Sequence, residues 1–184
     1  EAESEARLGS LLRAGLWAPL VAAARAHLAA YRSAHALAAA AAALIAAAAA
    51  LPDVQAEALQ LAERAQRIAP HDLPVMVTMT EALLAMGDAK RASDLAGDMR
   101  RKWSTNQHAI ALQATAWRML GDARYRRLYD YGALVWTSLL DVPEGWDSRE
   151  AYVADVSLAL NELHAFKEHP FNQSLRHGSQ AADI

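Results

Sequence analysis

The 184-residue chain contains no cysteine, which excludes disulfide bonds and thiolate metal sites and fits a cytoplasmic location. Glycine and proline are scarce, with 8 and 6 residues, and aromatic residues make up only 7% of the chain. This composition argues against a β-sandwich, a collagen-like chain or a disordered segment. Alanine takes their place with 45 residues, about a quarter of the chain, and it is the strongest helix former. We therefore expect an all-α protein.

The chain also lacks an excess of positive charge and a long run of large apolar residues. Its net charge of −3 argues against a partner that is a nucleic acid. Residues 33–52 carry no formal charge and are long enough to raise the question of a membrane span. Most of them are alanine, which contributes little transfer energy. We expect this stretch to be a helix buried on several sides by other helices, and we expect no membrane span.

A short motif marks an internal repeat. The sequence MGDA at residues 86–89 recurs as LGDA at residues 120–123, so the two glycines lie 34 residues apart. Each glycine permits a tight exit from one helix, and each aspartate can cap the start of the next. The candidate turn residues are Gly87, Asp88, Gly121 and Asp122, with Gly15 in a similar turn nearer the N-terminus. This period and these joints resemble those of the tetratricopeptide repeat (TPR).

The register of the repeat predicts the helices of residues 1–130. Pro70 falls where the second helix of a TPR ends, and it places the next repeat near Leu73 with its turn at Gly87. We expect helices over residues 2–13, 17–31, 34–50, 54–69, 74–86, 89–102, 107–120 and 123–130. The predicted fold class is all-α, a TPR-like α-solenoid of helical hairpins with about three and a half repeats. An unrelated helical bundle is the alternative.

A solenoid of this kind has a face that binds peptides or partner proteins, so we expect a protein or peptide partner on the TPR face. The alternative is an array that only spaces or dimerises another domain. Basic residues concentrate on the predicted helix 89–102 and just after residue 124. They are Lys90, Arg91, Arg100, Arg101, Lys102, Arg126 and Arg127. This surface suits either an acidic partner or simple solvation of a helix face.

The helical pattern stops at about Asp130, and residues 131–184 carry 3 basic and 8 acidic side chains. Residues 131–142 (YGALVWTSLLDV) are rich in aromatic and β-branched residues, which predicts a strand. Residues 143–145 read as a turn. Asp147 begins a sequence like a capping box, which predicts an amphipathic helix ending near Phe166. We therefore expect a short strand–helix–loop extension after the repeats.

The last residues, HPFNQSLRHGSQ at positions 169–180, follow a Leu-His pair at 163–164. This tail resembles the opening of the bacterial 2-oxoglutarate/Fe(II) oxygenases that occur behind TPR arrays, whose motif is close to HPLDQSLRGGTQ. His177 departs from that pattern, which prefers glycine there. The resemblance implies that residues 131–184 are the N-terminal portion of an incomplete oxygenase-like domain, with residues 1–130 as the repeat domain. The resemblance implies that Gln173, Ser174, Arg176 and Gln180 lie beside the cosubstrate or substrate, and the alternative is that Gln173, Ser174 and Arg176 only hold a loop in place by hydrogen bonds.

The chain itself does not supply the iron site that such an enzyme needs. A facial triad begins with a histidine and an acid two residues later, and none of the 7 histidines has Asp or Glu at that position. We therefore predict no catalytic residue, metal site or cofactor in this chain, and a fragment that is inactive alone. The resemblance implies Fe(II) and 2-oxoglutarate as cofactors of a full-length dioxygenase. The alternative is a stand-alone TPR module for interaction or dimerisation, without enzymatic activity.

Overall fold

The computed structural model describes residues 1–128 and 130–164 and is all-α over these residues, with no strand among them. The helices, in chain order, are α1 (Ala2–Arg13), α2 (Trp17–Ala30), α3 (Ala34–Ala47), η1 (Pro52–Val54), α4 (Gln55–Ile68), α5 (Leu73–Ala85), α6 (Ala89–Lys102), α7 (Gln107–Met119), η2 (Ala123–Arg127), α8 (Tyr131–Leu134) and α9 (Arg149–Leu163). Contacts divide the chain into two units, Glu1–Asp130 and Tyr131–Ile184. None of the described helices combines the length and apolar character needed to span a bilayer.

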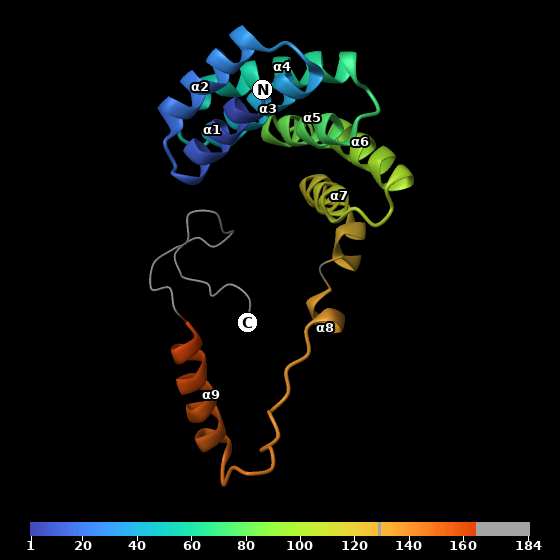
Figure 1. The fold of residues 1–184 in the computed structure, drawn as a ribbon. Helices are drawn as coiled ribbons and strands as arrows, with labels where there is room; N and C mark the ends of the chain where they lie inside the picture. The colour runs from blue at the N-terminus through green and yellow to red at the C-terminus, as the bar shows by residue number, and fades with distance from the viewer. Residues whose placement is uncertain (129, 165–184) are drawn as a thin grey trace. The chain divides into compact units, whose positions relative to one another are not determined.

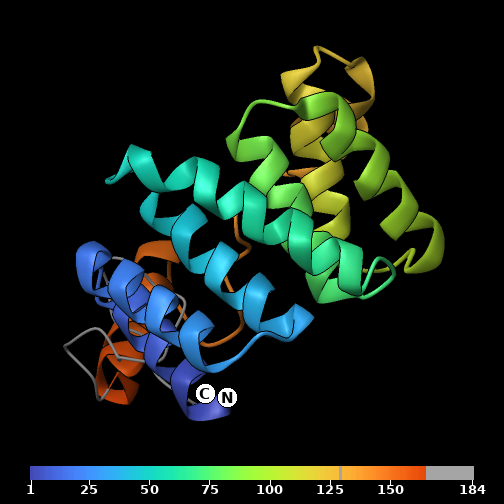
Figure 2. The same cartoon turned by 90° about the horizontal axis from the view of Figure 1, so that it is seen from above.

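The first unit is built from hairpins that follow one another along the chain (Figure 1). Each helix from α1 to α7 packs against the next, and the first helices of successive hairpins also touch, in the pairs α1–α3, α3–α5 and α5–α7. Figure 2 shows these hairpins from above. The second helices begin at Gln55 in α4, Ala89 in α6 and Ala123 in η2, so consecutive starts are 34 residues apart. The arrangement is that of a repeat-like array.

Helix α3 forms the centre of this unit, because α1, α2, α4 and α5 all contact it. Nine of its 14 residues are buried, and seven of these nine are alanine: Ala34, Ala36, Ala38, Ala40, Ala41, Ala43 and Ala47. Small side chains on several sides of one helix let four neighbours approach its backbone closely. The expectation of a helix buried on several sides is confirmed.

The sequence predicted the helices up to Met119 to within three residues at either end, and local caps explain several of the starts. The side chains of Ser33, Asp72 and Asn106 accept hydrogen bonds from the third backbone N–H of the helices that follow them. The joint between α3 and α4 contains no glycine, and the 3₁₀ turn η1 occupies it. The helix predicted over residues 123–130 is shorter, a 3₁₀ helix over Ala123–Arg127.

The strand predicted over residues 131–142 is wrong. Tyr131–Leu134 is the short helix α8, and residues 135–142 form no regular structure. Aromatic and β-branched side chains favour a strand only when a neighbouring strand pairs its backbone, and no described segment does so. The turn before α9 is present and contains Gly145 at φ 101°.

The final helix is also shorter than predicted, because it ends at Leu163. Its N-cap is Ser148 rather than Asp147, since the Ser148 hydroxyl accepts a hydrogen bond from the Ala151 N–H at 3.1 Å. Helix α9 has no buried residue, and Leu160 and Leu163 on its predicted apolar face are half exposed. The described part of the second unit therefore contains no core of its own.

Candidate functional site

The predicted turn glycines share one backbone geometry. Gly15, Gly87 and Gly121 have φ values of 66°, 80° and 69°, the left-handed region that favours glycine. At Gly87 the Asp88 N–H donates to the carbonyl of Leu83, and the glycine N–H donates to that of Leu84. Equivalent pairs of hydrogen bonds close the turns at Gly15 and Gly121, so all three are Schellman motifs. These glycines build the joints of the array.

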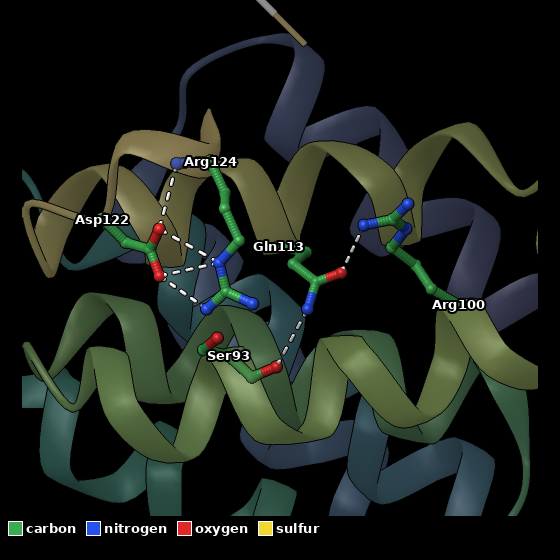
Figure 3. Close-up of polar contacts among 5 residues, drawn as sticks. All are labelled: Ser93, Arg100, Gln113, Asp122 and Arg124. Carbon is green, nitrogen blue, oxygen red and sulfur yellow. Dashed lines mark hydrogen bonds and ion pairs between the residues drawn. The ribbon is translucent and has the colours of Figure 1, made fainter. Parts of the chain in front are cut away.

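The predicted capping aspartates also act at the joints. The Asp88 carboxylate accepts from the Arg91 N–H at 3.2 Å, and the Asp122 carboxylate accepts from the Arg124 N–H at 3.0 Å. The Arg124 guanidinium folds back onto Asp122 with Nε–Oδ2 and Nη2–Oδ2 distances of 2.9 and 2.5 Å (Figure 3). This hydrogen bonding from Arg124 holds the pKa of Asp122 below its usual value. Both aspartates are thus structural caps.

A buried amide joins helices α6 and α7. Gln113 of α7 accepts from Arg100 of α6 at 2.6 Å and donates to the Ser93 carbonyl at 3.4 Å (Figure 3). The Trp117 ring contacts two guanidinium groups, with the Arg100 and Arg124 Cζ atoms 5.6 and 4.8 Å from its centroid. Through these contacts Arg100, one of the basic residues noted in the sequence, packs between α6 and α7.

The other basic residues of α6 have local partners too. Lys90 pairs with Asp94 at 2.6 Å, Arg91 reaches Glu63 of α4 at 3.5 Å, and Arg101 pairs with Asp98. Acidic side chains therefore offset much of the basic surface that the sequence shows on this helix. Lys102 differs, because its Nζ lies 3.5 Å from the His71 carbonyl and 4.5 Å from the Trp103 ring centroid, and no carboxylate of the described residues pairs with it.

Lys102 and Trp103 border an open cavity of about 400 Å³, which we call the α4–α6 cavity. Its apolar lining comes from Met76 of α5, Leu95 of α6 and Trp103. Its polar lining consists of Gln66, His71, Asp98, Arg101 and Lys102, and Pro70 completes it. Met76 is buried, while the charged residues are exposed. The cavity thus combines an apolar floor with two cations at its rim.

A second cavity, of about 320 Å³, lies one hairpin earlier, and we call it the α2–α4 cavity. Its lining residues are Leu28, Tyr31, Arg32, Leu37 and Arg64. Leu37 and Met76 are each the fourth residue of their helix, and Arg64 and Asp98 are each the tenth. The two cavities therefore occupy equivalent places in the repeat. Each presents an aromatic ring and cations beside aliphatic side chains.

Sequence reasoning missed these cavities, because each one takes its lining from three helices and a loop. The signal available was the recurrence of an aromatic residue next to a basic one at the end of a second helix, Tyr31-Arg32 and Lys102-Trp103. The predicted residues Gln173, Ser174, Arg176 and Gln180 lie outside the described residues, as do His169 and His177.

The described part of the second unit carries apolar side chains that are largely exposed. Trp136 is 91% exposed and Leu139 is 80% exposed. Arg149 ties α9 to the preceding segment by donating to the Leu140 carbonyl at 2.7 Å, and Trp146 packs edge-on against Tyr152. These few contacts order the segment locally without burying any residue.

No protein-family model matches this chain, nor does any curated protein sequence or solved structure. Over the residues that the structure describes, the protein is all-helical, and its first unit packs as sequential hairpins with repeat-related cavities.

Proposed function

We propose that residues 1–130 form a TPR-like scaffold that binds an extended segment of another protein. The observation that carries this proposal is the pair of repeat-related cavities. Each cavity offers aliphatic side chains for an apolar anchor and cations for a nearby carboxylate. A ligand that follows the array would meet the same chemistry twice, as expected for a repeat protein that binds a linear segment.

The electrostatics of the α4–α6 cavity favour an acidic partner. Asp98 already offsets Arg101, whereas Lys102 at the rim pairs with no carboxylate among residues 1–128 and 130–164. In the α2–α4 cavity, the lining includes Arg32 and Arg64 and no acidic residue. A segment with apolar side chains spaced between aspartates or glutamates would complement both sites.

A selection from a library of random peptides tests this scaffold function on the full chain. We expect enrichment of peptides that carry both acidic and apolar residues. Replacement of Lys102 by glutamate reverses the charge at the cavity rim and should weaken the selected peptides at least about tenfold, since a charged hydrogen bond is worth roughly 1.5–3 kcal/mol. Binding would be measured by fluorescence anisotropy.

The matched control is Lys90→Glu, which makes the same charge reversal on the same helix, away from the cavity lining. Its affinity for the peptides should stay close to that of the unmodified chain. Equal losses in Lys90→Glu and Lys102→Glu would mean that only overall charge matters. A selection without enrichment would refute peptide binding by the array.

We also propose that residues 131–184 begin a 2-oxoglutarate/Fe(II) oxygenase domain, as their resemblance to that family implies. The exposed apolar side chains of residues 131–163 support this reading, because further elements of such a domain would cover them. The histidines of this chain lack the acidic partner at the second following position, so they do not fit the iron triad. The iron ligands would have to come from other residues.

The genomic reading frame tests this second proposal. We expect codons downstream of Ile184 that encode a histidine, an acid two residues later and a distant second histidine. A protein extended through those codons should release succinate from 2-oxoglutarate in the presence of Fe(II), while the 184-residue chain should release none. A reading frame that stops at Ile184 would favour the alternative, a TPR module for interaction or dimerisation without enzymatic activity.

A further inference from the structure

Helices α1 and α2 bring three metal-ligating side chains together at the start of the array. One carboxylate oxygen of Glu1, one of Glu5 and one ring nitrogen of His27 all lie within 4.8 Å of one another. Glu1 and Glu5 are four residues apart at the start of α1, so their side chains share one face of the helix. His27 comes from the last turn of α2, which packs against α1.

His27 is the unusual member of this group. Its side chain is only 1% exposed, and its Nε2 atom is buried without a hydrogen-bond partner among the described residues. The other ring nitrogen, Nδ1, lies 2.9 Å from the Ser4 hydroxyl. A buried polar atom that makes no hydrogen bond costs about 1–3 kcal/mol, so this nitrogen calls for a partner, which a bound ion or a water supplies.

We propose that Glu1, Glu5 and His27 form a binding site for a transition-metal dication of the Zn²⁺ class. The charges match, because two carboxylates and a neutral imidazole balance a 2+ ion. An imidazole ligand selects zinc-like metals over Mg²⁺ and Ca²⁺, which prefer oxygen ligands alone. Three protein ligands leave a fourth position for water or a group from a partner.

The surroundings supply the supporting contacts that metal sites use. Ser4 lies 2.9 Å from Nδ1 of the His27 ring, as the outer partner of a metal-bound histidine does, and we assign the second nitrogen, Nε2, as the metal ligand. Ser33 donates a hydrogen bond to the Glu1 carboxylate at 2.7 Å and orients it. Tyr31 packs against the His27 ring, with centroids 5.1 Å apart.

The glutamates can close onto an ion because they retain freedom to move. Ligand atoms around a tetrahedral zinc stand roughly 3.3 Å apart, given metal–ligand distances of about 2.0 Å. The present separations are at most 4.8 Å, so the carboxylates need to move inward by up to about 1.5 Å. Glu1 is exposed and Glu5 is half-buried, so both side chains can make this adjustment while His27 stays fixed.

Zinc titration of the full chain against a chromogenic chelator tests the site. We expect one Zn²⁺ ion bound per chain and no competition from Mg²⁺. Replacement of Glu5 by glutamine should weaken binding at least about tenfold, the loss that even an outer-shell change causes. The matched control is Glu3→Gln, which removes the same charge from the same helix at an exposed position outside the cluster and should leave the affinity unchanged.

Nuclear magnetic resonance of the histidine side chains provides a second measurement on the unmodified chain, which keeps the test independent of any variant that folds poorly. The His27 ring signals should shift as zinc is added, before those of exposed His71 and His108. The proposal is wrong if zinc shifts only the exposed rings, if no zinc binds, or if Glu3→Gln and Glu5→Gln bind zinc equally. None of these measurements depends on peptide binding, so they test the metal site independently of the proposed scaffold function.

Discussion

Replacement of Leu44 by alanine is expected to lower the free energy of unfolding of the first unit by about 3 kcal/mol. Leu44 is fully buried in α3, the helix that four others contact. Most of the neighbouring core positions on α3 are alanines, so few nearby side chains are long enough to move into the space that the leucine leaves. Such a loss is a large share of the roughly 5–15 kcal/mol that stabilises a typical domain.

Urea denaturation followed by circular dichroism measures this change. The control is Leu12→Ala, at a position that is 40% exposed near the end of α1. We expect the control to lose less than about 1 kcal/mol, because part of its side chain already contacts water. Similar midpoints for the two variants would contradict the central position of Leu44 in the core.

Replacement of Ala41 by leucine is expected to destabilise the protein by about 2 kcal/mol, although it adds apolar surface. Ala41 is fully buried on the same helix and belongs to the hydrophobic core of the first unit. A leucine there must push a neighbouring helix outward or adopt an unfavourable rotamer.

Thermal unfolding distinguishes this steric effect from a general effect of leucine. Ala111→Leu places the same change on α7 at an exposed position, where the expected effect is within about 0.5 kcal/mol. If Ala41→Leu unfolded at the same temperature as Ala111→Leu, the alanines of α3 would not be packing residues, and a different explanation of their abundance would be needed.

The hairpins could be predicted from the sequence because their determinants are local. A glycine at a left-handed position and an aspartate at the next cap fix a joint within a few residues, as at Gly87-Asp88 and Gly121-Asp122. The segment at residues 131–142 has no such local determinant. Its aromatic and β-branched residues favour a strand whose partner is not among the described residues, and only the short helix α8 forms.

The candidate sites could not be predicted for a different reason, which is that their residues meet only after the helices pack. Met76 of α5 and Trp103, the residue that follows α6, line one cavity, and His27 meets Glu1 and Glu5 across 22 or more positions of sequence. No spacing rule relates such residues. The residues near the C-terminus that the sequence singled out, such as Arg176, remain predictions, since they lie outside the described part of the chain.

The ion pairs between second helices restrict how this array can evolve. Arg25 of α2 pairs with Glu57 of α4 at 2.7 Å, and Glu63 of α4 pairs with Arg91 of α6 at 3.5 Å. The earlier helix supplies the base in the first pair and the acid in the second. Helix α4 therefore presents an acid to both neighbours. A tandem copy of the α3–α4 hairpin inserted beside the original would set Glu57 of one copy against Glu63 of the other, and like charges would repel. Duplication of two adjacent hairpins, whose second helices carry opposite charges, would therefore lengthen the array more readily than duplication of a single hairpin.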